Sequence, residues 1–506
     1  MTARIALPLA VAALALHLAT AGRYGYFRDE LYFIECAKHL AWGYVDQPPF
    51  VPFVAWLTTP VGYALVALRA LPAIAAALCV ALSIALVARL GGGVFARCLA
   101  GLLVLLMPAY LLLGSTLTTT SFEPLTWMLA IYCTVALVQS GGAWRWWIAL
   151  ALTFAFALYC KDSIALLAAT LLLGLLATPQ RRVLSLRLAA AIAVTAALLA
   201  PNLLWQGAHA WPMLEVLRGD AAHRPALQNG VALQYAGLAR NAVAFIAEQF
   251  LYANPLAAPI WIAGIAAPFF MRSLRSIRFV SIAALLTIAV AIAMDAKGYY
   301  VIGVYGALTV VGCVWLERLA PAARAALAAA PVALALAALP FAVALLPVSG
   351  LLSYEEGLHL TSSAQPRLLQ PVYAEEFGWR RLARDVAAQY LRLPRWKRAT
   401  TAIYADTYGD ASALNFFGPG YGLPPAISSQ NSFYLWGPGA NAGTTLIAVG
   451  ATRIDRLRRY YRSVRLVATS FDPMRWIVEG PAPIYLCQEP IAPLRKIWPH
   501  LRWYGA

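Results

Sequence analysis

The sequence predicts a mainly α-helical, polytopic membrane protein that ends in a small α/β domain. Apolar residues make up 61% of its 506 positions and charged residues only 12%. That charged share is about half of what soluble domains carry. The mean hydropathy is +0.68. Long apolar runs recur up to about residue 347, and charged residues become denser after about residue 348.

Apolar runs in the first part of the chain predict eleven membrane spans, because a spanning helix needs about 20 mostly apolar residues. They are expected near residues 5–21, 69–88, 97–113, 122–139, 145–160, 163–178, 187–205, 251–270, 279–295, 300–317 and 325–347. The first run lacks a small-residue cleavage site, which favours a retained signal anchor. We therefore expect a transmembrane domain over residues 1–347 and an extracytoplasmic domain over residues 348–506.

Arginine marks every second loop between the expected spans. These arginines are Arg89, Arg97, Arg145, Arg181, Arg182, Arg187, Arg272, Arg275, Arg278, Arg318 and Arg324. Because cytoplasmic loops are enriched in Arg and Lys, we expect them, and the N-terminus with Arg4, on the cytoplasmic side of a bacterial inner (plasma) membrane. The loops over residues 22–68 and 206–245 and the C-terminal domain would then be periplasmic.

The C-terminal part alternates predicted strands with predicted helices. Residues 375–391 have the pattern of an amphipathic helix, and residues 452–461 form a second helical piece. Short strands are expected at residues 400–405, 445–449, 464–469 and 484–487. This alternation is typical of a small α/β domain of about 150 residues.

Several function classes are disfavoured. The net charge of +17 does not indicate a nucleic-acid partner, because the basic residues punctuate apolar runs and form no recognition face. The seven cysteines are scattered without metal-ligand spacing. The sequence contains no phosphate-binding Walker loop, no dinucleotide fingerprint and no nucleophile elbow, which argues against an ATP-driven machine.

The most informative stretch is the loop over residues 28–49, which carries many charges between two apolar runs. Such a segment must reach water, because an unpaired carboxylate in the bilayer is costly. We expect a surface helix that begins near Asp29 and Glu30, where the helix dipole favours negative charge. Gly43 is expected to end this helix, and Pro48-Pro49 to form an extended turn.

Further polar residues lie in other loops that are expected at the same membrane face. They are Asp46, Gln47, Glu123, Lys161, Asp162, Asp295, Lys297, Tyr299 and Tyr300. Lysines and carboxylates from separate loops indicate a site for an anionic head group. Lys161 and Lys297 would neutralise a phosphate, and Asp29 would accept a proton from an attacking hydroxyl.

Each of these residues also has a structural interpretation. Asp29 would serve only as a helix cap, and Glu123 would only begin a span. Lys161 and Lys297 would reach from the bilayer edge into water. Tyr299 and Tyr300 would belong to an aromatic belt. The sequence leaves these alternatives open.

Two motifs in the first external loop resemble bacterial membrane glycosyltransferases of the protein O-mannosyltransferase type, to which the lipid A aminoarabinose transferases are related. The motifs are Arg28-Asp29-Glu30-Leu31-Tyr32 and Trp42-Gly43-Tyr44-Val45-Asp46-Gln47-Pro48-Pro49. The resemblance continues through residues 120–125, 161–163, 201–206, 297–300 and 415–425, so it covers nearly the whole chain.

The resemblance implies a C-type glycosyltransferase fold, a polyprenyl-phosphate-linked sugar donor and inversion at the anomeric carbon. It implies that Asp29, with Glu30 beside it, supplies the catalytic base and that Lys161 binds the donor phosphate. It also matches Glu123 to an acidic position before a proline, and Tyr299 or Tyr300 to a tyrosine near the donor phosphate.

The expected activity is therefore transfer of a hexose or pentose to an envelope lipid, glycan or protein. No metal is required, although a divalent cation occurs in some relatives. Gln47 stands where relatives that modify lipid A often have lysine, so the resemblance assigns no aminoarabinose specificity to this chain.

Two other classes remain as alternatives. A transporter or binder of lipid-linked glycans without chemistry would use the same basic cleft, but it would tend to have Gly- or Pro-broken spans in matching halves, which this sequence lacks. A purely structural envelope protein would not need lysines and carboxylates in four external loops.

Overall fold

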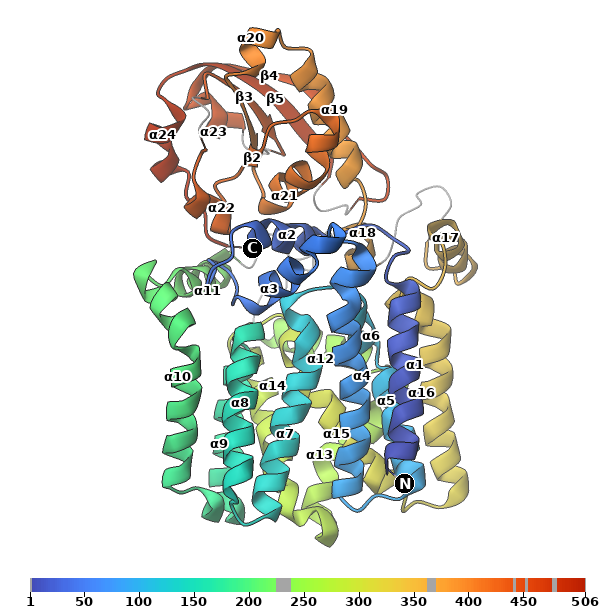
Figure 1. Ribbon diagram of the computed structural model, residues 1–506. Helices are drawn as coiled ribbons and strands as arrows, with labels where there is room; N and C mark the ends of the chain where they lie inside the picture. Colours follow the sequence, from blue (N-terminus) through green and yellow to red (C-terminus); the bar gives the residue numbers. More distant parts are fainter. Residues whose placement is uncertain are drawn as a thin grey trace. The chain divides into compact units, whose positions relative to one another are not determined.

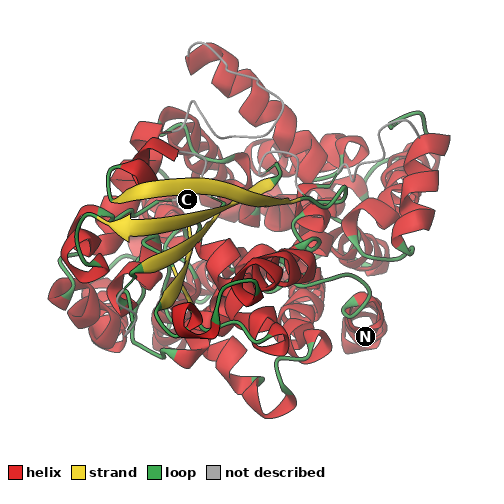
Figure 2. Ribbon diagram, turned by 90° about the horizontal axis from the view of Figure 1, so that it is seen from above, coloured by secondary structure: helices red, strands yellow, loops and turns green. Residues whose placement is uncertain are grey.

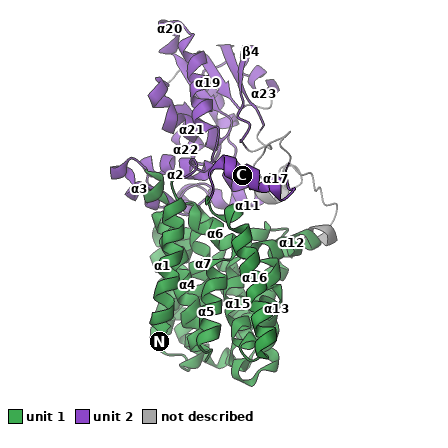
Figure 3. Cartoon of the chain, turned by 90° about the vertical axis from the view of Figure 1, so that its right-hand side faces the viewer, with its two compact units in different colours: residues 1–22, 64–204, 235–345 green, residues 23–63, 205–234, 346–506 purple. Residues whose placement is uncertain are grey.

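The structure, a computed structural model, describes residues 2–223, 238–361, 370–439, 443–450, 454–475 and 480–505. It is mainly helical (Figure 1), and a five-stranded sheet accompanies the helices (Figure 2). The chain divides into two compact units (Figure 3). Unit 1 comprises residues 1–22, 64–204 and 235–345, and unit 2 comprises residues 23–63, 205–234 and 346–506. The predicted fold class, a helical membrane protein with a C-terminal α/β part, is confirmed.

Unit 1 consists of apolar helices. These are α1 (Thr2–Thr20), α4 (Leu65–Arg89), α5 (Val94–Leu105), α6 (Pro108–Ser115), α7 (Glu123–Gln139), α8 (Trp144–Cys160), α9 (Ile164–Leu176), α10 (Leu186–Ala208), which runs on into unit 2, α12 (Leu238–Tyr252), α13 (Ala258–Phe270), α14 (Arg278–Ala293), α15 (Gly303–Leu316) and α16 (Pro321–Ala342). Short 3-10 turns connect them: η2 (Thr119–Phe122), η3 (Pro179–Val183), η4 (Pro255–Ala257), η5 (Arg272–Ile277) and η6 (Gly298–Val301).

Each of the eleven predicted spans overlaps apolar helix in unit 1. Within the described residues, six helical stretches are long and apolar enough to cross a membrane: α1, α4, η2 with α7, α10, η5 with α14, and α16. Two further candidates are bent pairs, α5 with α6 (56°) and α12 with α13 (93°). Their breaks lie just before Pro108 and Pro255, residues that cannot continue a helical hydrogen-bond ladder. Helices α8, α9 and α15 are apolar but shorter.

The core of unit 1 lies around α4 and α15. Helix α4 packs against α1, α5 and α7, and α15 packs against α13, α5 and α7. Gly264 of α13 and Gly312 of α15 allow the closest approach, because a Cβ at either position would collide with a backbone carbonyl of the other helix. Small residues are typical of such contacts in membranes, where backbones pack directly.

The first segment of unit 2 holds α2 (Arg28–Lys38), α3 (Phe50–Leu57) and η1 (Thr59–Val61), and α11 (Pro212–His223) belongs to the same unit. The prediction that Gly43 ends the surface helix is wrong, because α2 ends at Lys38. The Tyr44 hydroxyl contacts the carbonyls of Cys36 (3.1 Å) and His39 (3.3 Å) and accepts a hydrogen bond from the Ala41 N–H. These contacts hold the residues after Lys38 in a turn, so the helix does not continue to Gly43. Helix α3, which begins directly after Pro49, was not predicted.

The rest of unit 2 alternates helices and strands. Its helices are α17 (Val348–Gly357), α18 (Pro371–Ala374), α19 (Trp379–Leu391), α20 (Arg395–Arg398), α21 (Tyr408–Phe417), α22 (Asn431–Trp436), α23 (Ile454–Arg458) and α24 (Leu494–Ile497), with η7 (Gly418–Tyr421) and η8 (Trp498–His500). Its strands are β1 (Thr401–Ala405), β2 (Ala426–Ile427), β3 (Thr445–Val449), β4 (Tyr461–Ser470) and β5 (Ala482–Pro490).

The strands form one sheet in the order β2-β1-β3-β5-β4. Strand β1 is parallel to β2 and β3, with Ile403 opposite Ile447, whereas β5 is antiparallel to both β3 and β4. Every residue of β1 and β3 is buried, as expected of parallel strands covered on both faces. Helices α19 and α21 pack against each other and on the sheet, and Leu457 of α23 joins the core under the other face.

All four predicted strands are confirmed, and β2 is an additional short one. The predicted helix over residues 375–391 begins only at Trp379, because Gly378 before it adopts a left-handed φ of 83°. The helical piece predicted over residues 452–461 spans Ile454–Arg458, and residues 452 and 453 lie outside the described part.

Candidate active site

The predicted site residues fall into two groups, one in each compact unit, and we describe each group by itself. The Asp29 cluster belongs to unit 2 and comprises Arg28, Asp29, Tyr32, Asp46 and Tyr408. The Lys161 cluster belongs to unit 1. It comprises Thr120, Glu123, Lys161, Ser163, Lys297, Tyr299 and Tyr300.

Asp29 is the second residue of α2, and its side chain is 29% exposed. The Tyr408 hydroxyl donates a hydrogen bond of 2.8 Å to Asp29 Oδ1, and Arg28 Nε lies 3.3 Å from the same oxygen. These two donors fix one oxygen of the carboxylate in place. Asp29 is thus an oriented, solvent-accessible carboxylate, as a general base requires.

Tyr408 was not predicted as a site residue. It begins α21, which packs against α2, and its ring centroid lies 4.6 Å from that of Tyr32. Burial raises the pKa of Tyr408 well above its usual value, and Asp29 raises it further while Arg28 opposes this. The hydroxyl therefore stays protonated and remains a donor to Asp29.

Glu30 has a structural contact. Its side chain is fully buried, and Oε2 accepts a hydrogen bond of 2.9 Å from the backbone N–H of Phe27. This bond satisfies one of the donors left open at the start of α2. The helix cap that the sequence allowed for Asp29 is therefore made by Glu30.

Asp46 and Gln47 point into unit 2. Asp46 accepts hydrogen bonds from the Tyr32 hydroxyl (2.8 Å) and from Asn431 Nδ2 (2.9 Å), and burial raises its pKa to about 7. Gln47 is only 2% exposed, and its Nε2 lies 3.5 Å from Cys36 Sγ. These contacts hold the loop against α2 and α22.

Lys161 follows the last residue of α8, and its side chain is 15% exposed. Its ammonium donates to Thr120 Oγ1 (2.7 Å) and to Glu123 Oε2 (3.4 Å). Glu123 begins α7, is 3% exposed, and accepts a further hydrogen bond from the Ser163 hydroxyl. The ammonium is thus held inside unit 1 by an ion pair.

Two aromatic rings lie against the same ammonium. The Lys161 Nζ atom is 5.0 Å from the ring centroid of Tyr299 and 4.7 Å from that of Tyr300. The two rings are nearly perpendicular, at 88°. Both belong to η6, which Gln249 of α12 anchors by donating to the Gly298 carbonyl (3.1 Å). The tyrosines stabilise the cation through their π faces.

Lys297 adds a second positive charge to the Lys161 cluster. Burial lowers the pKa of Lys161, Glu123 opposes this shift, and the neighbouring charge of Lys297 lowers the pKa further. Lys297 makes no hydrogen bond or ion pair with any residue that the structure describes. Asp162, beside Lys161, is exposed. This end of the helices thus brings the ammonium groups of Lys161 and Lys297 together with the carboxylates of Glu123 and Asp162.

The described residues contain no group of three or more His, Cys, Asp or Glu side chains that could hold a metal ion. The carboxylates of the Asp29 cluster are instead engaged by tyrosine, asparagine and arginine donors. These two carboxylates are thus bound to protein donors, and no step below depends on a metal.

Comparisons with known proteins agree with the resemblance seen in the sequence. Residues 46–205, which include Asp46, Glu123 and Lys161, match the family model described as dolichyl-phosphate-mannose-protein mannosyltransferase. The crystal structure of ArnT from Cupriavidus metallidurans bound to undecaprenyl phosphate has 16% sequence identity and a TM-score of 0.63. The alignment covers 96% of this chain and 98% of that one.

The apo structure of the same ArnT gives 16% identity and a TM-score of 0.60, covering 95% of this chain and 97% of that one. No curated protein matches the sequence. The family-model match confirms the predicted resemblance over residues 46–205, and the likeness to ArnT confirms the predicted fold of a helical membrane protein with a small C-terminal sheet.

Proposed function

We propose that this multi-pass membrane protein transfers a sugar from a polyprenyl-phosphate donor to an envelope lipid, glycan or protein on the periplasmic side of a bacterial inner membrane. The match to the mannosyltransferase family and the fold shared with an ArnT bound to undecaprenyl phosphate support this proposal. The single observation that carries it is the Lys161 cluster, in which an ion-paired, aromatic-packed ammonium lies near a second lysine without a partner among the described residues.

In the proposed site, Lys161 and Lys297 bind the phosphate of the donor. Glu123 keeps Lys161 charged although burial disfavours the ammonium, and Tyr299 and Tyr300 fix its position. Polyprenyl phosphate leaves as an anion of low basicity, so it needs electrostatic stabilisation more than a proton. A fixed cation in a partly desolvated site provides this better than water does.

Asp29 acts as the general base on the acceptor. The acceptor oxygen attacks the anomeric carbon, and the bond from that carbon to the phosphate oxygen breaks with its electron pair going to the polyprenyl phosphate. The acceptor proton passes to Asp29, whose other oxygen Oδ1 is fixed by Tyr408 and Arg28. A single displacement of this kind inverts the anomeric carbon.

The remaining predicted residues have supporting roles in this proposal. Glu30 caps α2 and so fixes the backbone that carries Asp29. Asp46 and Gln47 hold the loop after α2 through Tyr32, Asn431 and Cys36. Asp162 lies beside Lys161 after the end of α8, and its charge favours the ammonium form of Lys161.

The direct test is incubation of the purified protein with a panel of radiolabelled polyprenyl-phosphate sugars and total envelope lipid. We expect label from one donor to move to an acceptor, with release of polyprenyl phosphate in equal amount. A transporter or binder of lipid-linked glycans would retain the donor without releasing polyprenyl phosphate. That result with every donor would contradict the proposed transfer.

A further inference from the structure

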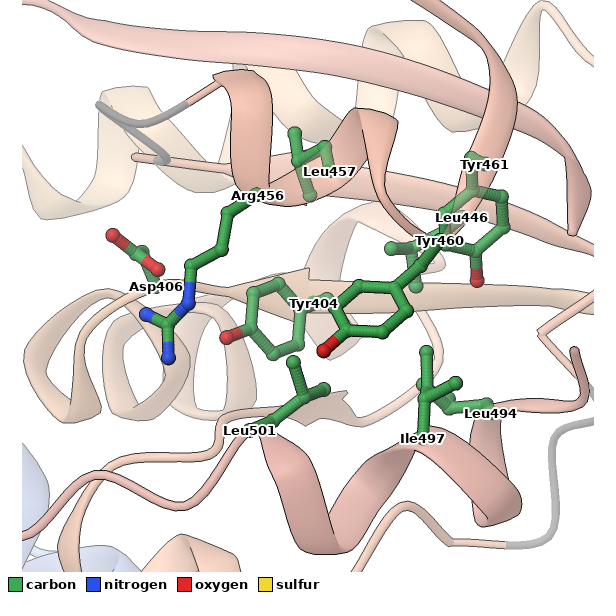
Figure 4. Close-up of a pocket in the computed structure, with 10 residues that line it drawn as sticks. All are labelled: Tyr404, Asp406, Leu446, Arg456, Leu457, Tyr460, Tyr461, Leu494, Ile497 and Leu501. Carbon is green, nitrogen blue, oxygen red and sulfur yellow. The ribbon is translucent and has the colours of Figure 1, made fainter. Parts of the chain in front are cut away.

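The hollow shown in Figure 4 is part of the packed interior of unit 2. Tyr404, Leu446, Leu457 and Tyr461 line it, and all four belong to the buried apolar cluster beneath the sheet. Protein interiors are close-packed, so the side chains of such a cluster stabilise the fold by contacting one another. A second ligand site is instead indicated in unit 1.

Unit 1 carries exposed arginines on two short turns between its helices. Arg181 and Arg182 belong to η3, which follows α9, and Arg272 and Arg275 belong to η5, which precedes α14. All four residues are exposed. We call these four residues the arginine patch.

The packing of α9 on α14 brings the two turns together. At Gly174, near the end of α9, a Cβ would collide with the carbonyl of Phe279, the second residue of α14, so the two backbones touch there. Turn η3 begins shortly after α9 ends, η5 leads directly into α14, and both turns also pack against α7. Both lie at the same end of unit 1 as the N-terminus in Figure 1. The arginine patch is therefore one surface built from two distant segments.

Apolar side chains of the same turns hold the backbone that carries the arginines. Leu274 and Ile277 of η5 are each 1% exposed, and Val183 of η3 packs against the core of unit 1. The Thr178 hydroxyl, just before η3, donates a hydrogen bond of 3.0 Å to the Gly174 carbonyl of α9. The turns are thus anchored from below, and their arginines face outward.

The guanidinium groups of the arginine patch make no hydrogen bond or ion pair with any residue that the structure describes. The surrounding sequence offers no counter-charge either, since no Asp or Glu occurs between residues 163 and 214 or between residues 249 and 294. Four positive charges on one surface repel one another, so a bound anion lowers the electrostatic energy.

One carboxylate from another helix comes near η5, but its oxygens are occupied. Arg318, after α15, donates a hydrogen bond of 2.9 Å to Ser273 of η5, which places the neighbouring Glu317 close to this turn. The two carboxylate oxygens of Glu317 accept from the backbone N–H groups of Gly93 (2.6 Å) and Ala96 (3.2 Å) at the start of α5. Glu317 therefore serves as a helix cap and leaves the arginine patch without an internal anion.

We infer that the arginine patch binds the phosphate head group of an anionic phospholipid. Turn η5 begins a helical stretch that is long and apolar enough to cross a membrane, so the arginines lie where a span meets the head groups. A guanidinium donates two parallel N–H bonds to phosphate, and basic surfaces between membrane helices recognise phosphate-bearing lipids.

This site is separate from the proposed active site. Helix α9 begins directly after Ser163 of the Lys161 cluster and ends just before η3, so the two sites lie at opposite ends of one helix. The inference therefore does not rest on the proposed transfer reaction. It also goes beyond the sidedness of the arginines, because it requires both turns to bind one head group.

The test is native mass spectrometry of the purified full chain titrated with phosphatidylglycerol, with phosphatidylcholine of the same acyl chains as the neutral probe. We expect the first phosphatidylglycerol to bind at least about tenfold more tightly than phosphatidylcholine, which is the gain from one charge-assisted hydrogen bond. Excess inorganic phosphate should not displace it, because the acyl chains also contact the helices. Equal binding of the two lipids, or displacement by inorganic phosphate, would overturn the inference.

Paired variants locate the lipid. Arg181→Gln with Arg182→Gln, and Arg272→Gln with Arg275→Gln, should each weaken phosphatidylglycerol binding at least about tenfold. Arg458→Gln with Arg459→Gln is the matched control, because these two adjacent arginines of unit 2 are also exposed. A second control, Arg4→Gln, removes an exposed arginine of α1, a helix that packs on α4, α5 and α6. Both controls should bind the lipid as the wild type does.

The combination of all four patch substitutions tests whether the turns form one site. Its loss of affinity should be smaller than the product of the two paired losses, because both turns bind the same head group. The thermal unfolding midpoint in phosphatidylcholine shows that each variant is folded. Wild-type affinity in both folded pairs, or losses that multiply in full, would overturn the inference.

Discussion

The Tyr408 hydroxyl donates a 2.8 Å hydrogen bond to Asp29 Oδ1, although the two residues are 379 positions apart in the chain. Both belong to unit 2, where α21 packs against α2. The C-terminal α/β part therefore orients the carboxylate that we propose as the base. This contact motivates the first prediction.

Tyr408→Phe should lower the turnover number about tenfold and leave the KM of the donor nearly unchanged. The ring and its packing on Tyr32 remain, but Asp29 loses the neutral donor that fixes its oxygen. Steady-state transfer kinetics measure the effect. Tyr390→Phe is the control, since its hydroxyl also bonds within unit 2 but to the Arg398 carbonyl. Equal kinetics of the Tyr408 variant and this control would show that Tyr408 has no positioning role.

Asp46 makes the stability of unit 2 depend on pH. Burial raises its pKa to about 7, whereas an unfolded chain loses this proton near pH 4. Between these values the folded chain binds more protons than the unfolded chain, so the free energy of unfolding falls as pH rises from about 4 to about 7. Asp46→Asn cannot ionise and should flatten this part of the curve.

The measurement is the thermal unfolding midpoint of the purified protein at several values across that pH range. The absolute midpoint of Asp46→Asn is not the readout, because the new amide also alters the contact with Asn431. Asp455→Asn, at an exposed position of α23, should keep the wild-type pH dependence. A wild-type slope in Asp46→Asn would mean that this carboxyl does not titrate with folding.

The sequence predicted the spans and strands well because both rest on local patterns. Strand β3 was expected at residues 445–449 and lies at Thr445–Val449. Helix α21 was missed because its sequence contains Gly409, Asp410, Ser412 and Asn415, which are weak helix formers. Its start was signalled only by Thr407, whose side chain accepts from the Asp410 N–H. Missing α21 also meant missing Tyr408.

Long-range pairing was outside what one sequence can reveal. The sequence placed Glu123 and Lys161 at one membrane face, but their ion pair depends on how α7 and α8 pack. It considered a helix cap only for Asp29 and not for Glu30, since Phe27 at the cap position gives no capping signal. The burial of Gln47 against Cys36 likewise follows from tertiary packing.

The lysines should act together on the donor phosphate. Lys161→Gln and Lys297→Gln should each weaken binding of a polyprenyl phosphate by about 1.5–3 kcal/mol, typical of a hydrogen bond to a charged partner. The double variant should be non-additive, because both side chains bind one group. Titration of polyprenyl phosphate against the purified variants measures this.

Two further variants make the lysine test specific. Lys161→Gln leaves Glu123 buried without its cation, so it should also be combined with Glu123→Gln, which removes both charges of the pair. Lys397→Gln in unit 2 is a control for loss of one positive charge. If Lys161 and Lys297 only reach toward water at the bilayer edge, both single variants will bind with wild-type affinity.

The arginine-rich loops predict the orientation of the chain in the membrane. A reporter that is active only outside the cytoplasm should be active when fused after residue 350 and silent when fused near Arg182. Both fusions can be compared in cells at equal protein level. The opposite pattern would put Asp29 and the lysines on the cytoplasmic side and remove the proposed periplasmic acceptors.

The central claim is tested most directly by sugar transfer from a polyprenyl-phosphate donor with wild-type protein and with Asp29→Asn. The asparagine keeps the shape and can still accept from Tyr408, but it cannot take the proton of the acceptor. We predict that transfer falls by about two to four orders of magnitude while donor binding is unchanged. An Asp29→Asn protein that transfers sugar at half the wild-type rate would contradict the assignment of Asp29 as the base.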